Sequence, residues 1–205
     1  IFVLALPLYH IHGLGVAVCG SLHVGNFTIL KKKFVAEDVL ETIQKRKATL
    51  FMGVPTMYFK LLDVEGLEKY DISSMRLFIS GSAPLSKDMF YKLRKALGHD
   101  ILERAGMSES MMNFSNPYDG ERMPGSVGPC LPGVKVRITD KNYNDVPVGA
   151  EGEILIKGPN VFNGYWNKPS YNKQCFRDGW FITGDVGKID EKNYVYIIGR
   201  SKDVI

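Results

Sequence analysis

Two polar residues in the second half of the chain have the chemistry to hold a nucleotide. Asp185 ends the run Phe181-Ile182-Thr183-Gly184-Asp185, and its carboxylate can accept hydrogen bonds from both hydroxyls of a ribose. Arg200 follows one short predicted hairpin later, and its planar guanidinium can reach a ribose or a phosphate. A Thr-Gly-Asp run alone is a weak signal, so its weight depends on the motifs around it.

A loop of small residues follows a predicted strand in the first half of the chain. Gly81, Ser82, Ala83 and Pro84 leave room for a flat ligand against the backbone. Ligands of open α/β sheets bind beyond the carboxyl ends of the strands, which is where this loop lies. A tight strand-to-helix turn would use Gly and Pro equally well, and this motif alone favours that alternative.

Arg104 is the residue that bears on the substrate. It ends the predicted strand segment Leu102-Glu103-Arg104, and a buried guanidinium needs an anion because an unpaired buried charge is costly. Its neighbour Glu103 should point to the opposite face of the strand. A second carboxylate on the substrate would pair well with Arg104. In the alternative, Arg104 pairs with Asp100 or Glu109 and only organises the loop.

His10 and His12 lie near the N-terminus, in the run Leu6-Pro7-Leu8-Tyr9-His10-Ile11-His12-Gly13. Their spacing is i, i+2 and not i, i+4, so a helical metal pair is not supported. Taken alone, both would be structural histidines.

Residues 1–100 are expected to alternate strand and helix, which favours a mostly parallel sheet with helices on both faces. The predicted strands are Phe2–Leu8, Phe27–Leu30, Thr49–Val54 and Arg76–Ser80. The predicted helices are Leu14–Val24, which is expected to be buried, Ala36–Lys47, Pro55–Leu62, and a helix capped by Ser86 that runs to Leu97.

The second half changes character near residue 125. It is rich in Gly, Pro and β-branched residues, which predicts smaller, largely antiparallel sheets with strands at Val134–Thr139, Glu153–Lys157 and Tyr194–Ile198. We therefore expect an α/β subdomain over 1–123, a β-rich subdomain over 124–198 and a hinge over 199–205.

The composition excludes several classes of protein. The 205 residues carry a formal net charge of +4, which is too mild to imply nucleic acid. The three cysteines are far apart, which argues against disulfides and zinc and fits a reducing compartment, the cytoplasm or a mitochondrial matrix. No apolar stretch is long enough to span a membrane. The chain opens on Ile1 within an apolar run, which is expected of a segment of a longer protein.

Four motifs in order resemble the adenylate-forming enzymes, the acyl-CoA synthetase and luciferase superfamily. They are Gly152–Asn160, Gly164-Tyr165-Trp166, Thr183-Gly184-Asp185 and Gly199-Arg200-Ser201-Lys202-Asp203. The resemblance implies the fold of part of the large N-terminal domain of that family. It also implies an ATP-dependent acid–thiol ligase that uses ATP, Mg²⁺ and coenzyme A.

The resemblance also implies roles for single residues. Glu109, in Ala105-Gly106-Met107-Ser108-Glu109, matches the family's metal-binding and catalytic Glu, and Ser108 keeps a hydroxyl that could face a phosphate. Ala105 departs from the family pattern, because the family has a Tyr there that stacks on adenine. The nucleotide-binding set implied is Gly81, Ala83, Pro84, Ser108, Asp185 and Arg200.

Within the superfamily, the chain most closely resembles the malonyl-CoA synthetases. The resemblance rests on segments around His12, Met52–Thr56, Leu102–Arg104 and Asn113–Gly120, and it spans essentially all 205 residues. It implies that Arg104, Ser82, Met107 and His12 bind the substrate, with His10 and Arg104 in the catalytic set. The expected partners are a small-molecule carboxylate, ATP and CoA.

Two parts of the family's machinery have no match in this sequence: a phosphate-binding loop ending in Pro-Lys-Gly, and a small C-terminal domain that rotates about a hinge, here expected at Asp203. The chain alone is therefore expected to be inactive. Two alternatives stay open: a degenerate homologue that binds nucleotide without chemistry, and a synthetase for a monocarboxylate or fatty acid.

Overall fold

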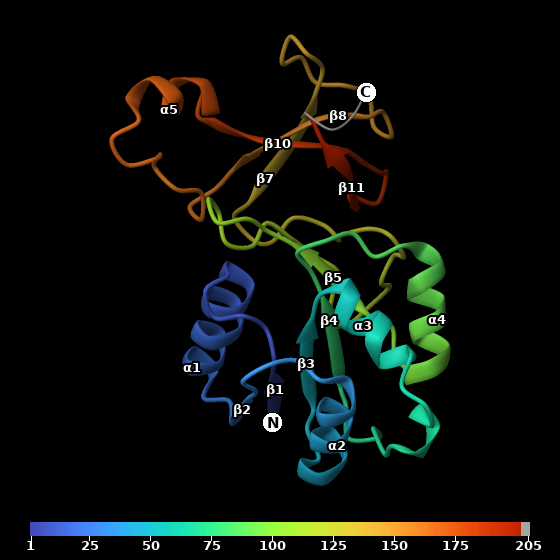
Figure 1. The fold of residues 1–205 in the computed structure, drawn as a ribbon. Coiled ribbons are helices and arrows are strands. Elements are labelled where there is room, and N and C mark those ends of the chain that lie inside the picture. The colour runs from blue at the N-terminus through green and yellow to red at the C-terminus, as the bar shows by residue number, and fades with distance from the viewer. Residues whose placement is uncertain (202–205) are drawn as a thin grey trace. The chain divides into compact units, whose positions relative to one another are not determined.

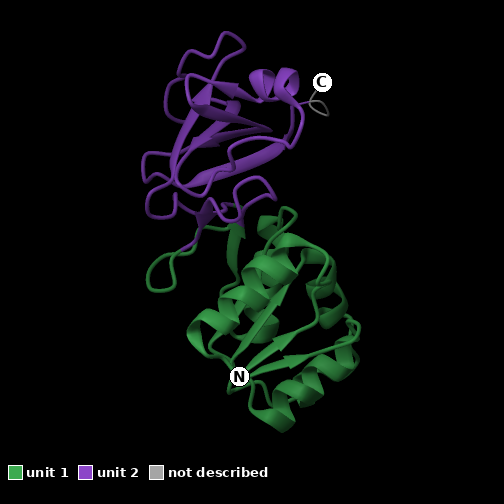
Figure 2. Cartoon of the chain, turned by 90° about the vertical axis from the view of Figure 1, so that its left-hand side faces the viewer, with its two compact units in different colours: residues 1–104, 117–125 green, residues 105–116, 126–205 purple. Residues whose placement is uncertain are grey.

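The computed structural model describes residues 1–201, which form two compact units (Figure 2). Unit 1 comprises residues 1–104 and 117–125, and unit 2 comprises residues 105–116 and 126 onward. The chain passes between the units three times, after Arg104, Asn116 and Gly125. Asp203, the expected hinge residue, lies outside the described residues.

Unit 1 is built on a parallel sheet with the strand order β2-β1-β3-β4-β5. Its elements are β1 (Phe2–Leu4), η1 (His12–Cys19), α1 (Gly20–Val24), β2 (Thr28–Leu30), α2 (Ala36–Arg46), β3 (Leu50–Gly53), α3 (Pro55–Leu62), η2 (Leu67–Lys69), β4 (Leu77–Ser80), α4 (Lys87–Leu97) and β5 (Leu102–Ala105), whose last residue belongs to unit 2.

The strand order reverses at β1, and this determines which face each helix covers. The connection from β1 to β2 runs one way along the sheet, and the later connections run the other way. Right-handed crossovers then place η1 and α1 on one face and α2, α3 and α4 on the other (Figure 1). The side chains confirm helices on both faces: Val3, Phe51 and Phe78 pack with α2, α3 and α4, whereas Leu4 and Met52 pack with Ala17 of η1.

Two predictions for unit 1 are corrected. The first strand ends at Leu4, not at Leu8, because its partner β2 ends at Leu30 and Pro7 has no N–H to donate. The segment Leu14–Val24 is helical, and η1 is a π-helical stretch, but it is not buried. Only the face that carries Ala17 packs on the sheet, so Leu22 on the outer face is 77% exposed.

The other predicted helices of unit 1 form where their terminal residues indicated. Ser86 caps α4, with its Oγ accepting a hydrogen bond from the Met89 amide at 3.2 Å. Pro55 is the first residue of α3, where its missing N–H costs nothing.

Unit 2 is built on an antiparallel sheet with the strand order β11-β10-β8-β7, with β9 paired to β10. Its elements are β6 (Phe114–Ser115), β7 (Lys135–Thr139), β8 (Gly152–Lys157), α5 (Pro169–Cys175), β9 (Phe176–Arg177), β10 (Trp180–Ile189) and β11 (Val195–Arg200). The predicted antiparallel strands are confirmed. Neither α5 nor the full length of β10 was predicted from the sequence.

One carboxylate joins two loops of unit 1. Glu103 of β5 is buried, and its Oε2 and Oε1 accept hydrogen bonds from the amides of Leu85 (3.3 Å) and Gly125 (3.2 Å). Burial raises the pKa of Glu103 to about 7, and the two amide donors only partly oppose that shift. Glu103 therefore anchors the loop that follows β4 from the face of β5 opposite to Arg104.

No helix among residues 1–201 is long and apolar enough to cross a membrane.

We predict that Glu103→Gln changes how the stability of the chain depends on pH. Because the pKa of Glu103 is about 7 when folded and near 4.5 when exposed, the folded state binds more protons between these values. Wild-type stability should therefore fall as pH rises from about 4.5 to 7, by up to about 3 kcal/mol from this group. Urea unfolding at pH 5 and pH 8 measures the change.

The Gln variant lacks this titration, so its stability relative to wild type should increase between pH 5 and pH 8. The exposed Glu65→Gln is the matched control and should follow the wild-type profile. An equal stability difference for Glu103→Gln at both pH values would contradict the prediction.

Candidate active site

A cationic site lies at the carboxyl ends of the strands in unit 1. Nη2 of Arg104, at the end of β5, lies 3.0 Å from Sδ of Met52 on β3 and 3.4 Å from Nε2 of His12, at the start of η1. Nδ1 of His12 lies 3.0 Å from Oγ of Ser82 in the loop after β4. Four segments of the sheet therefore converge on one place, where ligands of parallel sheets usually bind.

The electrostatics of this site favour an anionic ligand. Burial lowers the pKa of Arg104 to about 10, and the guanidinium still carries its charge at neutral pH. Burial, and then the charge of Arg104, lower the pKa of His12 to about 4, so the imidazole is neutral. Nε of Arg104 is buried without a hydrogen-bond partner in the described chain.

Asp100, the partner that the sequence suggested for Arg104 within unit 1, does not satisfy it. Asp100 forms an ion pair with Arg94 instead, and Glu103 points to the other face of β5. Within unit 1, all of which is described, no carboxylate lies within 4 Å of Arg104. A charged, half-buried guanidinium without a carboxylate partner in unit 1 has the chemistry to accept an anion such as a carboxylate.

The loop Gly81–Leu85 is held close to this site. Gly81 is buried, and its amide lies 3.3 Å from the Gly53 carbonyl. Ser82 has the left-handed backbone conformation (φ +68°), which is unusual for a side chain with a Cβ and turns its Oγ to His12. Ala83 and Pro84 are exposed.

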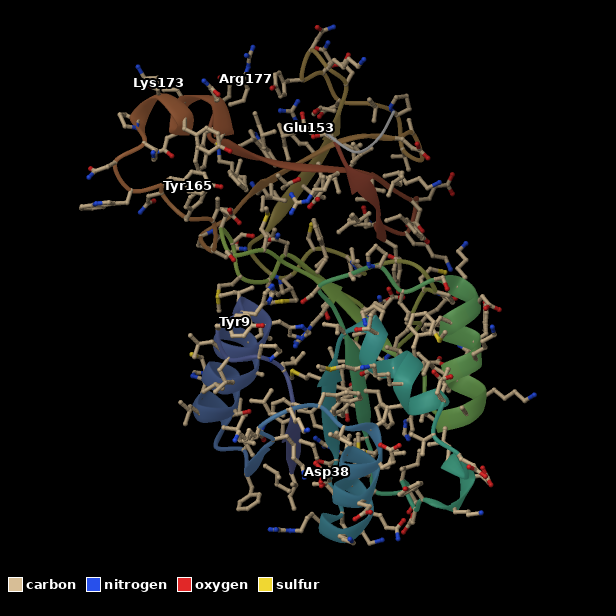
Figure 3. The ribbon with its side chains drawn as sticks, in the orientation of Figure 1. Tyr9, Asp38, Glu153, Tyr165, Lys173 and Arg177 are labelled. Atoms are coloured by element: carbon tan, nitrogen blue, oxygen red, sulfur yellow. The ribbon has the colours of Figure 1, made fainter. Side chains whose placement is uncertain are left out.

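His10 and Tyr9 lie at the surface of unit 1. His10 is exposed, and its Nδ1 accepts a hydrogen bond from the His12 amide at 3.3 Å, which supports the turn into η1. Tyr9 is 92% exposed (Figure 3). The structure places His12, and not His10, in contact with Arg104.

A second site is a pocket of about 570 Å³ that lies entirely within unit 2. It is lined by residues from the loop after β5, from the α5 region and from the β10–β11 hairpin: Met107, Glu109, Glu153, Tyr165, Tyr171, Gln174, Cys175, Phe181, Ile182, Thr183, Gly184, Arg200 and Ser201. The pocket brings together Glu109, Met107 and Arg200 of the predicted residues. Met107 thus lies beside Glu109, whereas the other residues predicted to bind the substrate lie in unit 1.

Glu109 is held by its backbone and by its side chain. Its carbonyl accepts a hydrogen bond from the Phe162 amide (2.8 Å), and its Oε1 accepts one from the Tyr165 hydroxyl (2.8 Å). The loop that carries it folds back at Gly106, where a Cβ would lie 1.8 Å from the Met111 carbonyl oxygen, so only glycine fits. Ser108 is exposed.

Asp185 and Arg200 form an ion pair across the β10–β11 hairpin. They are directly opposite in the antiparallel register, with Nε of Arg200 3.2 Å from Oδ1 of Asp185. Nη1 of Arg200 also donates to the Thr183 carbonyl at 3.1 Å. Burial raises the pKa of Asp185, although the charge of Arg200 acts in the opposite direction. The predicted hairpin between the two residues is therefore confirmed.

Sequence reasoning did not identify Tyr165, Tyr171, Gln174 and Cys175 as pocket residues. Gly164-Tyr165-Trp166 was used only as a motif that marks the family, and the motif by itself does not predict the contact between Tyr165 and Glu109. The others lie on or beside α5, which was not predicted, so their side chains could not be assigned to a face.

The donor set at Glu109 suits a metal ion that arrives with its ligand. Within residues 1–201, no three His, Cys, Asp or Glu side chains cluster as a metal cage. Mg²⁺ is commonly bound through one or two carboxylates together with substrate phosphates and water. The Glu109 carboxylate in this open pocket therefore fits Mg²⁺ that arrives bound to ATP.

Comparisons with known proteins identify the family of the chain. The family described as AMP-binding enzyme matches residues 1–166. The mitochondrial malonate–CoA ligase ACSF3 of Mus musculus is 39% identical over 235 aligned residues, covering 98% of this chain and 40% of the relative. A long-chain-fatty-acid–CoA ligase of Bacillus subtilis is also 39% identical, covering 98% of this chain and 36% of the relative.

A solved structure extends the comparison to the fold. ATP-bound MatB from Rhodopseudomonas palustris matches with a TM-score of 0.96 and 50% identity, covering 100% of this chain and 41% of that one. The chain thus spans about two fifths of the length of these proteins. The expected fold, part of the N-terminal domain of an acyl-CoA synthetase, is confirmed, and the chain belongs to the AMP-binding enzyme family.

Proposed function

We propose that the chain is part of an AMP-forming ligase that activates malonate and transfers it to coenzyme A. The observation that carries the proposal is Arg104, a half-buried guanidinium beside a neutral His12 with no carboxylate partner in unit 1. A fatty acid would leave this charge unpaired. A dicarboxylate would pair with it through one carboxylate and keep the other for reaction.

The proposed reaction has two steps. One malonate carboxylate attacks the α-phosphorus of ATP and expels pyrophosphate. The CoA thiol, losing its proton, then attacks the malonyl-adenylate to give the thioester and AMP. Protein groups form no covalent bond in either step, so positioning and charge neutralisation dominate.

In this proposal each site has a separate task. Arg104, with Ser82 and His12, binds and orients malonate, and His10 and Met107 remain candidates for the substrate-binding set. Glu109 binds the Mg²⁺ of the ATP complex. Asp185 and Arg200 bind the ribose and phosphates, and Gly81, Ala83, Pro84 and Ser108 remain candidates for nucleotide binding.

We further propose how the functions divide along the chain. Residues 1–123 would form the nucleotide- and acyl-binding part, 124–198 the β-rich part, and 199–205, with Asp203, the hinge to a further domain. The compact units differ from this division in assigning residues 105–116 to unit 2.

Two rival functions remain distinguishable. A ligase for a monocarboxylate or fatty acid is favoured by the Bacillus subtilis relative, which is as similar as the malonate–CoA ligase. A non-catalytic nucleotide-binding homologue is favoured by Ala105, which offers no ring where the family stacks adenine. ATP–pyrophosphate exchange by the full-length protein with malonate, acetate and a medium-chain fatty acid separates the three functions.

We predict that Arg104→Ala lowers kcat/KM for malonate about 30-fold. Loss of a hydrogen-bonded charge pair costs about 2 kcal/mol, which corresponds to that factor. Any exchange with acetate should be unchanged, because acetate has no second carboxylate to bind. Arg94→Ala is the control: it removes a guanidinium of unit 1 that is already paired with Asp100. Unchanged malonate kinetics in Arg104→Ala would refute the dicarboxylate site.

We also predict that residues 1–205 alone form no malonyl-CoA. The chain spans about two fifths of its relatives, and no match to the family's phosphate-binding loop or adenylation lysine domain is present in it. Thioester formation can be followed with free CoA and a thiol reagent, with the full-length protein as the positive control. Turnover by the isolated chain would show that these residues suffice.

A further inference from the structure

The Tyr165 hydroxyl is the side-chain donor that fixes the Glu109 carboxylate. The O–O distance is 2.8 Å, and within residues 1–201 Glu109 has no other side-chain hydrogen bond. The contact leaves the second carboxylate oxygen, Oε2, without a protein donor in the pocket that also contains Arg200. Because Oε1 is fixed by this hydrogen bond, the carboxylate presents Oε2 to a cation in a defined direction.

Tyr165 is itself held rigidly. The side-chain amide of Asn172 in α5 bonds to both backbone polar groups of Tyr165. Its Oδ1 accepts a hydrogen bond from the Tyr165 amide at 2.8 Å, and its Nδ2 donates one to the Tyr165 carbonyl at 2.9 Å. Gly164 makes room for this, since its φ is +133° and a Cβ there would lie 2.8 Å from Nδ2 of Asn172. The ring packs edge-on against Phe162 at a centroid distance of 4.8 Å.

The segment that carries Tyr165 also holds the loop that carries Glu109. Nδ2 of Asn160 donates to the carbonyls of Ser110 (2.8 Å) and Met112 (3.1 Å), and the Phe162 amide donates to the Glu109 carbonyl. Backbone and side chain of Glu109 are thus set by one stretch, residues 160–172, which Figure 3 shows leading through Tyr165 into α5.

We propose that Tyr165 is a positioning residue that orients Glu109 toward the Mg²⁺ of bound Mg-ATP, with Asn172 holding Tyr165 in place. The inference rests on the proposed function only in taking Mg-ATP as the ligand. A hydrogen bond that orients a metal-binding carboxylate is typically worth a factor of 10–100 in metal affinity or activity. The effect should therefore be visible in equilibrium binding, without catalysis.

The test measures ATP binding to the full-length protein by calorimetry, with Mg²⁺ titrated from zero to saturation. Tyr165→Phe should leave the Kd for ATP without Mg²⁺ unchanged. It should raise about 10-fold the Mg²⁺ concentration at which the Mg²⁺-dependent gain in ATP affinity is half-maximal. Asn172→Ala should raise the same Mg²⁺ concentration by a smaller factor. These changes affect the dependence on Mg²⁺ and leave ATP binding without Mg²⁺ unchanged. A general loss of structure would weaken both.

A matched control removes an equivalent bond elsewhere in unit 2. The Tyr196 hydroxyl donates to Oδ2 of Asp190 at 3.1 Å, remote from the pocket lining, so Tyr196→Phe loses the same type of contact. It should leave the Mg²⁺ dependence unchanged. In a Glu109→Gln background, Tyr165→Phe should add no further shift, because its effect acts through Glu109.

The outcomes separate the two proposals. If the wild-type protein binds Mg-ATP and Tyr165→Phe matches it at every Mg²⁺ concentration, the positioning role is overturned and the proposed function stands. Additive shifts from Glu109→Gln and Tyr165→Phe would also overturn it. If the wild-type protein shows no Mg²⁺-dependent ATP binding, the proposed function fails, and this inference fails with it.

Discussion

The candidate site of unit 1 depends on the cost of keeping the Arg104 charge out of water. The guanidinium stands at the end of β5, on the face of the sheet that η1 covers, and its neighbours there are a thioether and a neutral imidazole. Protein dipoles alone do not replace an anion at such a place. The parallel sheet makes this arrangement possible, because it brings the carboxyl ends of β1, β3, β4 and β5 to one edge. An antiparallel sheet would distribute the same four segments over two edges.

Unit 2 differs from unit 1 in that its predicted acidic site residues each have a protein partner. Glu109 and Asp185 are each restrained by a protein donor, a tyrosine hydroxyl in one case and a guanidinium in the other. The restraints come from different structures: a loop tied to α5, and the fixed register of an antiparallel hairpin. The hairpin residues are positioned by the backbone ladder itself, whereas Glu109 depends on side chains that were not evident from the sequence.

The sequence predicted most of unit 1 because its local signals agree with its packing. Ser86 and Pro55 mark helix starts, and alternating strands and helices dictate a parallel sheet. The prediction of burial was wrong for the apolar segment Leu14–Val24. The segment was expected to be a core helix, although only one side of it contacts the sheet, because burial depends on which elements pack around a helix. Similarly, α5 has no apolar stripe and no buried residue, so periodicity could not reveal it. Arg104, Glu109, Asp185 and Arg200 were identified by type and order along the chain, but the contacts of Tyr165 and Asn172 required coordinates.

The Asp185–Arg200 pair has a consequence for how the pocket meets a nucleotide. Arg200, which lines the pocket, is already paired with the Asp185 carboxylate across the hairpin, so the cation of the pocket has a counter-ion within the protein. Under the proposed function, a ribose that donates hydrogen bonds to Asp185, or a phosphate that accepts them from Arg200, replaces an existing contact between these two side chains. Binding is then an exchange of partners, and its free energy is a difference between two similar interactions.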